Sequence, residues 1–272
     1  MPEGDTLRAA EAAVAPLLEG WVLTEVWFRK IRGHLLRVGD VVNRVEAIGK
    51  YLTIEVARGL VLDTHLGMSG SWRALDAAPA GAAEPWRRNP KLRVLLGTEA
   101  GYALCFAAPT IETHLVTAET SRVLRLGPDL ARPEADLDEI VERTRARGSS
   151  LVLAEALLDQ QIAAGVGNVY KSEALFVAGR HPFAAVAETG DAELRSLWSI
   201  AKQLLIGNVS AFGTSERATG HRRVTTARGT AGATYVYGRH RLGCRVCDNA
   251  ILFSPAGDRT ARSTYWCAGC QQ

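Results

Sequence analysis

Residues 244–270 of the chain read CRVCDNAILFSPAGDRTARSTYWCAGC, in which two C-x-x-C pairs are separated by 19 residues. Two such pairs at this separation are typical of a tetrahedral zinc site, in which each tight turn directs two thiolates at one ion. Two disulfides are the alternative, although nothing else in the chain indicates an oxidising compartment. Because all four positions are cysteine and none is left for water, we predict one structural Zn²⁺ ion per chain. Its predicted ligands are Cys244, Cys247, Cys267 and Cys270.

Positive charge is concentrated at this same end of the chain. The 272 residues carry a net charge of only +3, but residues 216–272 hold nine arginines, no lysine and three carboxylates, a net +6 against −3 for the rest. An arginine-rich end of this kind indicates a polyanionic partner such as nucleic acid, and a solvated basic tail is the alternative. Arg239, Arg241 and Arg262 lie near the cysteines and are candidates for phosphate contacts.

The remaining composition is that of an ordinary globular protein, with 47% hydrophobic and 22% charged residues. No stretch free of charged residues is long and apolar enough for a membrane span, and the acidic start MPEGDT lacks the features of a signal peptide. We therefore expect a soluble, cytoplasmic protein with no membrane partner, and we expect it to be a monomer.

Upstream of the cysteines, a strand-rich half precedes a helical half. A helical pattern at 7–18, with Asp5 or Thr6 as its N-cap and Pro16 as a kink or early end, opens the chain. Strand patterns follow at 23–29, 51–57, 60–66, 71–75, 91–96 and 102–107, and residues 76–90 are predicted to be a loop. This spacing favours a β-sandwich or barrel, with Cys105 as one of its core residues.

The pattern changes near residues 125–133, where we expect a hinge. Helices are predicted at 137–147, 151–158, 169–177 and 192–206, and a Gly- and Arg-rich loop at 208–234. Within this half, LLDQQIAAGVGNVYKSEALF at 157–176 places a glycine-rich turn before a helix that begins near Asn168. The free N–H groups of that helix can receive a phosphate, and an ordinary helical hairpin is the alternative.

The chain opens with a further motif, Met1-Pro2-Glu3-Gly4. Removal of a methionine before proline exposes the Pro2 secondary amine, whose pKa of about 8 leaves a neutral, nucleophilic fraction at neutral pH. Such an amine can attack a sugar C1′ to form an iminium ion, and the adjacent Glu3 can transfer protons. By itself, a proline at position 2 is common and carries little weight.

Together these segments resemble the formamidopyrimidine-DNA glycosylase and endonuclease VIII family of base-excision repair enzymes. The matching pieces occur in the order of the family and span nearly the whole chain: MPEG at 1–4, IGKYL at 48–52, THLGMSGSWR at 64–73, LGPDL at 126–130, the segment at 157–175, and RSTYWCAGCQ at 262–271.

The resemblance implies an α+β fold in three parts. These are a β-sandwich with flanking helices at 1–125, a helix–two-turn–helix domain at 135–215 and a β-hairpin zinc finger at 235–272. Double-stranded DNA with damaged bases or abasic sites would lie in the cleft between the two halves, and the enzyme would work at the bacterial nucleoid. The implied activity is that of a bifunctional DNA glycosylase and abasic-site lyase, with no cofactor in the reaction itself.

The resemblance also implies roles for single residues. Pro2 matches the nucleophile that forms the iminium intermediate leading to β,δ-elimination. Glu3 matches the acid that assists sugar opening, and Lys50 matches the basic residue that reaches the phosphate of the damaged nucleotide and assists catalysis.

Three further matches concern DNA binding. Met68 falls in the loop whose side chain fills the gap left by a flipped base. Asn168 and Arg262 match the residues of the helical motif and the zinc finger that grip the DNA backbone.

Departures from the family bear on the preferred lesion. The second acid at position 6 is Thr6 here, with Asp5 shifted by one residue, and the stretch CFAAPTIETHL at 105–115 lacks the Arg-x-Phe pair of enzymes specialised for oxidised guanine. The opening and this absence favour the endonuclease VIII branch and oxidised pyrimidines, whereas the HLGMSGSW loop favours the guanine branch. The alternatives are an oxidised-purine glycosylase, a non-catalytic paralogue that binds damaged DNA, and a zinc-dependent transcription factor.

Overall fold

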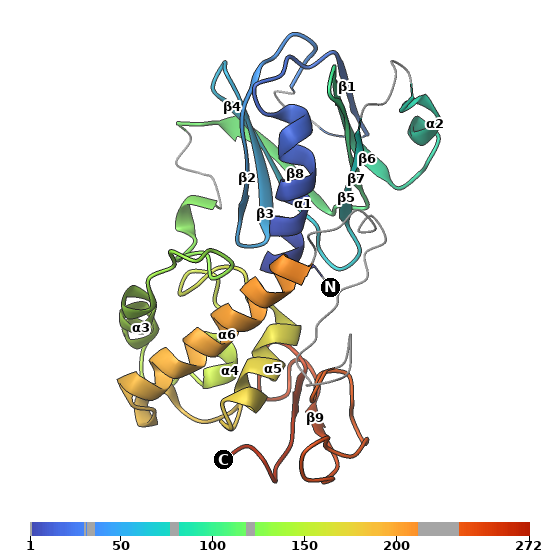
Figure 1. Ribbon diagram of the computed structural model, residues 1–272. Coiled ribbons are helices and arrows are strands. Elements are labelled where there is room, and N and C mark those ends of the chain that lie inside the picture. The colour runs from blue at the N-terminus through green and yellow to red at the C-terminus, as the bar shows by residue number, and fades with distance from the viewer. Residues whose placement is uncertain (1, 30, 32–35, 77–81, 118–122, 212–233) are drawn as a thin grey trace. The chain divides into compact units, whose positions relative to one another are not determined.

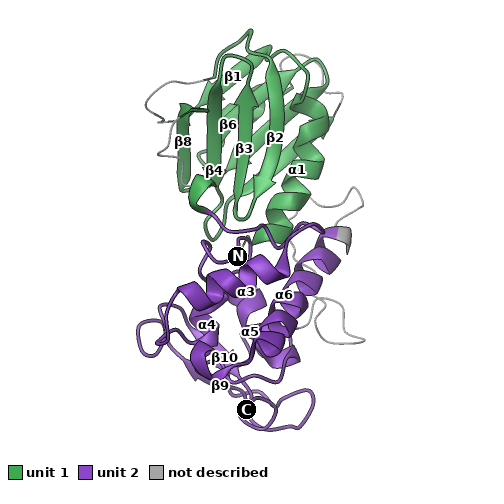
Figure 2. Ribbon diagram, turned by 90° about the vertical axis from the view of Figure 1, so that its left-hand side faces the viewer, with its two compact units in different colours: residues 1–125, 213–220 green, residues 126–212, 221–272 purple. Residues whose placement is uncertain are grey.

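The computed structural model describes residues 2–29, 31, 36–76, 82–117, 123–211 and 234–272. The described residues fall into two compact units, one up to Arg125 and one from Leu126 onward (Figure 2). Most of the predicted loop at 208–234 lies outside the described residues, although residues 208–211 are the end of a helix rather than a loop.

Unit 1 is a sandwich of two antiparallel four-stranded sheets (Figure 1). One has the order β1 (Glu25–Phe28), β6 (Leu92–Thr98), β7 (Gly101–Phe106), β5 (Ser71–Asp76), and the other β2 (Val42–Ile48), β3 (Tyr51–Val56), β4 (Leu60–His65), β8 (Thr110–Leu115). Apolar side chains from both sheets form one core, among them Leu52, Ile54, Val94 and Cys105. Cys105 is fully buried, as predicted, and burial raises the pKa of its thiol.

Helix α1 (Gly4–Leu18) packs against the edge strands β2 and β5. The Glu11 carboxylate accepts the Ala47 N–H at 2.8 Å, and the Glu19 carboxylate accepts the Val45 N–H at 2.6 Å. Glu11 is earlier in the chain than Glu19, but its partner Ala47 is later in β2 than Val45, the partner of Glu19. Helix α1 therefore runs antiparallel to β2. The start of α1 therefore lies toward the end of β2 that leads into β3.

The predicted N-cap was wrong. Glu3 occupies the N-cap position without a side-chain cap bond, and Asp5 and Thr6 lie inside the first helical turn. The helix continues past Pro16 to Leu18, although Pro16 lacks the N–H that would donate to the Ala12 carbonyl.

The sequence pattern missed two strands and a short helix. A register shift between Val42 and Arg44 interrupts the alternation of β2, and β8 is an edge strand with no fully buried side chain. The predicted loop at 76–90 contains α2 (Glu84–Arg87), and its residues 77–81 lie outside the described residues. A 3-10 turn, Val123–Arg125, follows β8 at the end of the unit.

Unit 2 combines a helical core with the cysteine-rich hairpin. Its helices are α3 (Leu137–Ala146), α4 (Leu153–Ala156), α5 (Asn168–Val177) and α6 (Asp191–Ala211), with a 3-10 turn at Val186–Glu188. The Asp136 carboxylate caps α3 by accepting the N–H groups of Asp138 and Glu139, whereas α4 is shorter than the predicted helix at 151–158. Strands β9 (Leu252–Ser254) and β10 (Thr264–Trp266) form the predicted antiparallel hairpin.

None of the described helices combines the length and the apolar character required to cross a bilayer.

Candidate active site and metal centre

Three of the predicted catalytic and DNA-contacting positions gather at one end of the sandwich in unit 1. Lys50 lies in the turn between β2 and β3. The start of α1, and with it Glu3, lies toward this same end of the sheet. Tyr51 at the start of β3 pairs with His65 at the end of β4, and their rings meet edge to face at 5.0 Å. The loop that carries Met68 follows His65 directly, so it lies at the same end of the sheet.

The first residues combine a partly accessible amine position with buried acids. Pro2 is partly exposed, whereas Glu3 and Asp5 are both fully buried. The backbone carbonyl of Glu3 accepts the N–H groups of Thr6 and Leu7, at 3.0 and 3.3 Å, which fixes Glu3 at the positive end of the α1 dipole. The Thr6 hydroxyl donates to Asp5 Oδ1 at 3.3 Å, so Asp5 and Thr6 act as a pair in this turn.

The Met68 loop is a tight turn that holds an apolar side chain in solvent. Met68 is 77% exposed, and the Gly70 N–H closes the turn by donating to the Leu66 carbonyl at 2.8 Å. Gly67 has a φ of 58°, and a Cβ there would lie 2.6 Å from the ring of Pro109. Since only glycine satisfies both conditions, the loop is built to present Met68 outward.

In unit 2, the glycine-rich segment before α5 is closed by one side chain. The Gln160 amide donates to the carbonyls of Leu158 and Val166, at 2.8 and 3.0 Å, and accepts the Gly165 N–H at 3.1 Å. These three bonds hold the loop in place directly before Asn168, the first residue of α5.

Asn168 and the turn that carries Arg262 are brought together, although they are far apart in the chain. Asn168 is 5% exposed, and its Nδ2 donates to the hydroxyl of Ser263 at 3.2 Å. Its Oδ1 is buried and has no hydrogen-bond partner among the described residues. Arg262, the residue before Ser263, is exposed. The two predicted backbone-gripping residues therefore lie on adjoining segments.

Two buried charged residues of α5 tie the helix to the finger, and the sequence analysis missed both. Lys171 is fully buried, and its Nζ donates to the Ser263 carbonyl and the Thr264 hydroxyl, each at 2.9 Å. Glu173 is also fully buried, and its carboxylate accepts three backbone N–H groups at 2.7–3.0 Å. Those donors belong to Tyr235, Val236 and Tyr237. The available signal was a helix whose pattern leaves no solvent-facing side for its charges.

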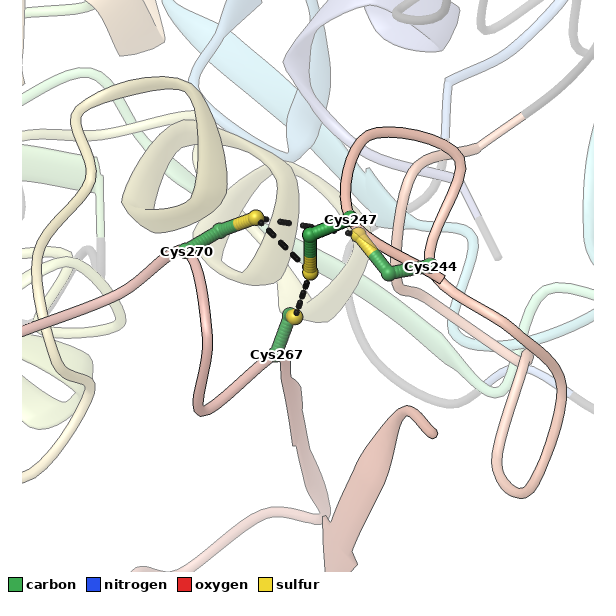
Figure 3. A group of neighbouring side chains, drawn as sticks. All are labelled: Cys244, Cys247, Cys267 and Cys270. Carbon is green, nitrogen blue, oxygen red and sulfur yellow. Dashed lines mark hydrogen bonds between the residues drawn. The ribbon is translucent and has the colours of Figure 1, made fainter. Parts of the chain in front are cut away.

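The four predicted metal ligands form one cluster at the end of unit 2 (Figure 3). All four sulfur atoms lie within 4.8 Å of one another, and three of the separations are 3.4, 3.4 and 3.8 Å. A disulfide needs about 2.05 Å, whereas sulfurs arranged tetrahedrally at about 2.3 Å from one ion lie roughly 3.8 Å apart. The cluster therefore has the geometry of a metal site and not of two disulfides.

The cluster also favours thiolate at one position. The backbone N–H of Asn249 donates to Cys247 and, with the neighbouring thiols, lowers the pKa of Cys247 to about 7. Burial raises the pKa of Cys267. A bound cation would deprotonate both, because it supplies the positive charge that the protein around Cys267 lacks.

Comparison with known proteins places these features in a family. The model of the formamidopyrimidine-DNA glycosylase N-terminal domain matches residues 1–110, and the model of the H2TH domain of the same enzymes matches residues 126–218. Together they cover more than half of the chain. The chain belongs to the formamidopyrimidine-DNA glycosylase family. The resemblance in the sequence motifs is thereby confirmed, and so is the predicted order of sandwich, helical domain and hairpin.

Individual members of this glycosylase family match over the full chain. A Streptomyces coelicolor protein named probable endonuclease 8 2 is 37% identical over 275 residues, covering 100% of this chain and 94% of its own. The DNA-(apurinic or apyrimidinic site) lyase Nei2 of Mycolicibacterium smegmatis is 34% identical, covering 100% and 99%. A Lactococcus lactis formamidopyrimidine-DNA glycosylase, solved with DNA containing an abasic site, shares the fold with a TM-score of 0.76 at 20% identity, covering 99% of each chain.

The Glu173 contacts lead to a first prediction about this family member. Glu173→Gln replaces one acceptor oxygen by an amide donor that faces backbone donors, and we expect a loss of roughly 2 kcal/mol of stability. For a chain of this size the corresponding fall in melting temperature is about 4–8 °C. A zinc-sensitive dye would follow metal release from the finger during heating. Glu188→Gln, which makes the same charge change at an exposed position, is the control, and equal midpoints for the two variants would contradict the prediction.

Proposed function

We infer that the chain is a DNA glycosylase with abasic-site lyase activity that works in base-excision repair. The match of family models to both units supports this, as does the name of the lyase among its relatives. The observation that carries the proposal is the arrangement at one end of unit 1, where Pro2 adjoins the buried Glu3 and the Lys50 turn and the exposed Met68 lie at the same end of the sheet.

Pro2 is the proposed nucleophile. Its nitrogen lone pair attacks C1′ of the damaged nucleotide, the bond from C1′ to the base breaks, and the base leaves with the proton that the Pro2 amine loses. Glu3, in its acid form, donates a proton to the sugar ring oxygen as the ring opens, which yields an iminium ion between Pro2 and C1′.

The iminium ion then drives strand cleavage. It acidifies the proton on C2′, and removal of that proton expels the 3′ phosphate by β-elimination. A second, δ-elimination expels the 5′ phosphate, and water releases the sugar fragment from Pro2. We assign Lys50 to the phosphate of the damaged nucleotide, where its charge offsets the negative charge of the leaving group.

Met68 is proposed to support base flipping. The Pro2 amine cannot reach C1′ inside a stacked duplex, so the nucleotide must leave the stack. An exposed thioether on a rigid turn can enter the vacated space and replace part of the lost stacking.

Unit 2 is proposed to hold the DNA backbone. The Asn168 amide and the Arg262 guanidinium donate to phosphate oxygens, and a structural Zn²⁺ held by the four cysteines keeps the Arg262 hairpin folded. We retain three functional parts: a catalytic part at 1–125, a helical part at 135–215 and the finger at 235–272. We also propose that the enzyme acts as a monomer at the bacterial nucleoid.

We further propose a preference for oxidised pyrimidines. The stretch at 105–115 lacks the Arg-x-Phe pair, and a relative named endonuclease 8 2 supports the same branch. An oxidised-purine preference is the second candidate, favoured by the Met68 loop.

A cleavage panel tests this preference. Duplexes that carry thymine glycol or 5-hydroxycytosine are compared with duplexes that carry 8-oxoguanine opposite cytosine, and we expect single-turnover base removal to be at least about tenfold faster for the pyrimidines. Pre-formed abasic sites serve as the control, since their cleavage needs no lesion recognition. Faster removal of 8-oxoguanine would overturn the preference and leave the lyase assignment intact.

A further inference from the structure

The turn that carries Arg262 is held in place from the side of α5. The Arg262 carbonyl accepts the hydroxyls of Thr260 and Thr264, at 2.5 and 3.2 Å. Thr264 also accepts from Lys171 Nζ, which donates in addition to the Ser263 carbonyl. A single buried ammonium group is therefore linked to the backbone on both sides of Ser263.

Lys171 cannot itself contact DNA from this position. Its side chain is fully buried, and its ammonium group donates to the Ser263 carbonyl and the Thr264 hydroxyl. Burial of a charge is costly unless strong hydrogen bonds compensate it. A buried lysine at this position therefore indicates that the turn it holds has a structural or functional role. The hydrogen bonds of the neighbouring Asn168 indicate that this role is the binding of an anion.

The Asn168 amide is incompletely satisfied in a way that suits an anion. With Nδ2 donating to Ser263, the buried Oδ1 lacks a partner within the described part of the chain. A half-turn of the amide would let the Ser263 hydroxyl donate to Oδ1 and would direct Nδ2, a donor, at the position without a partner. A phosphate oxygen, which only accepts hydrogen bonds, is the ligand that this second arrangement fits. Ser263 can serve both arrangements because a hydroxyl both donates and accepts.

We propose that Lys171 and Ser263 are positioning residues for DNA binding. Lys171 anchors the turn at 262–264 to α5 and so sets the spacing between Asn168 and Arg262, and Ser263 orients the Asn168 amide toward a phosphate oxygen. This inference rests on the proposed function, in which Asn168 and Arg262 grip the backbone. It adds that the two grips are coupled through a buried lysine.

Lys171→Met tests the anchor, because it removes the ammonium group and retains an apolar stem of similar length. We expect the Kd for a duplex with a stable abasic-site analogue to rise about tenfold. We also expect the slope of log Kd against log salt to fall by about 0.9, the value for one lost cation–phosphate contact, although Lys171 touches no phosphate. The single-turnover rate at saturating enzyme should change less than twofold, since the reacting groups lie in unit 1.

Lys202→Met is the matched control. Lys202 also lies in a helix of unit 2 and also ties down two backbone groups, the carbonyls of Pro133 and Ala135 at 2.6 and 2.9 Å. Lys202→Met makes the same change in net charge as Lys171→Met, and we expect it to change the Kd less than twofold. Equal effects of the two variants would overturn the proposal.

A double-mutant cycle separates positioning from general destabilisation. In an Arg262→Ala background the salt slope has already lost one contact, so Lys171→Met should lower it no further. An additional fall in slope of the same size would show that Lys171 acts independently of Arg262 and would overturn the coupling.

If Lys171→Met does not fold, substitutions of Ser263 test the proposal with a smaller change to the packing. Ser263→Ala should weaken binding about fivefold with unchanged zinc content, and Ser263→Thr, which retains the hydroxyl, should restore it. Unaltered binding by Ser263→Ala would contradict its role. If the wild-type chain itself fails to bind the abasic-site analogue, the proposed function fails; if wild type binds and the variants bind equally well, only this inference fails.

Discussion

An N-terminal extension that converts the Pro2 amine to an amide is expected to abolish covalent trapping of the chain on abasic-site DNA by borohydride. The amide nitrogen shares its lone pair with the carbonyl, so it cannot attack C1′ and no iminium ion forms for borohydride to reduce. Removal of a covalent nucleophile typically costs several orders of magnitude, and we expect strand cleavage to fall by at least about 10³-fold. Binding of the uncleaved analogue should change much less, since Asn168 and Arg262 lie in unit 2.

The same protein provides its own control. A protease site placed directly before Pro2 allows the extension to be removed, and trapping should return with the free amine. Glu3→Gln, in a chain with a free Pro2, should slow the glycosylase step more than it weakens binding, because it removes the proton donor. If the extended chain cuts and traps as well as the free one, Pro2 is not the nucleophile. If the free chain binds abasic DNA without trapping, the non-catalytic paralogue is the better description.

Loss of the metal is expected to unfold the finger and to remove most DNA affinity. Structural Zn²⁺ contributes about 10–16 kcal/mol of folding free energy in isolated finger peptides at neutral pH. The hairpin β9–β10 has three residues in each strand and cannot bury enough surface to replace that contribution. Chelation of the metal, or Cys247→Ser, should therefore release one zinc per chain and lose the salt-dependent binding that Arg262 supplies.

Cys105→Ala is the control for this experiment. Cys105 is also a buried thiol, but it lies in the core of the sandwich, so its loss should leave one zinc per chain and unchanged binding. Titration of thiols in the unfolded, metal-free chain should find five, whereas two disulfides would leave one. A zinc-free Cys247→Ser chain with full DNA affinity would contradict the assigned structural role.

Much of this molecule follows from local spacing. Two C-x-x-C pairs specify a four-sulfur site because the geometry of each pair is set within a few residues, and the cluster formed as expected. Alternation of apolar residues located β3, since period-two burial is a property of the strand itself. Strands β4 and β7 are buried at nearly every position and were located as apolar runs between turns. Local patterns failed at β2, where a register shift interrupts the alternation. They also failed at α4, where the helical pattern at 151–158 is longer than the helix itself, Leu153–Ala156.

The local sequence also carried the motifs that place Pro2, Glu3, Lys50 and Met68 at chain ends and turns. Their assembly at one end of the sandwich did not follow from it, because that depends on α1 running antiparallel to β2 and on Tyr51 pairing with His65. Contacts between segments are set by burial against distant partners, which no window of neighbouring residues contains.

The burial of Lys171 is the clearest case of a feature that the sequence alone did not predict. In the sequence it is one lysine of a helix, and an exposed position is the ordinary expectation for a lysine. Its partners, Ser263 and Thr264, come from more than ninety residues further along the chain. A buried charge is tolerated only where such partners satisfy it. The sequence therefore identified the family and the four cysteines that cluster, while the packing of the finger on α5 decided how Asn168 and the Arg262 turn are brought together.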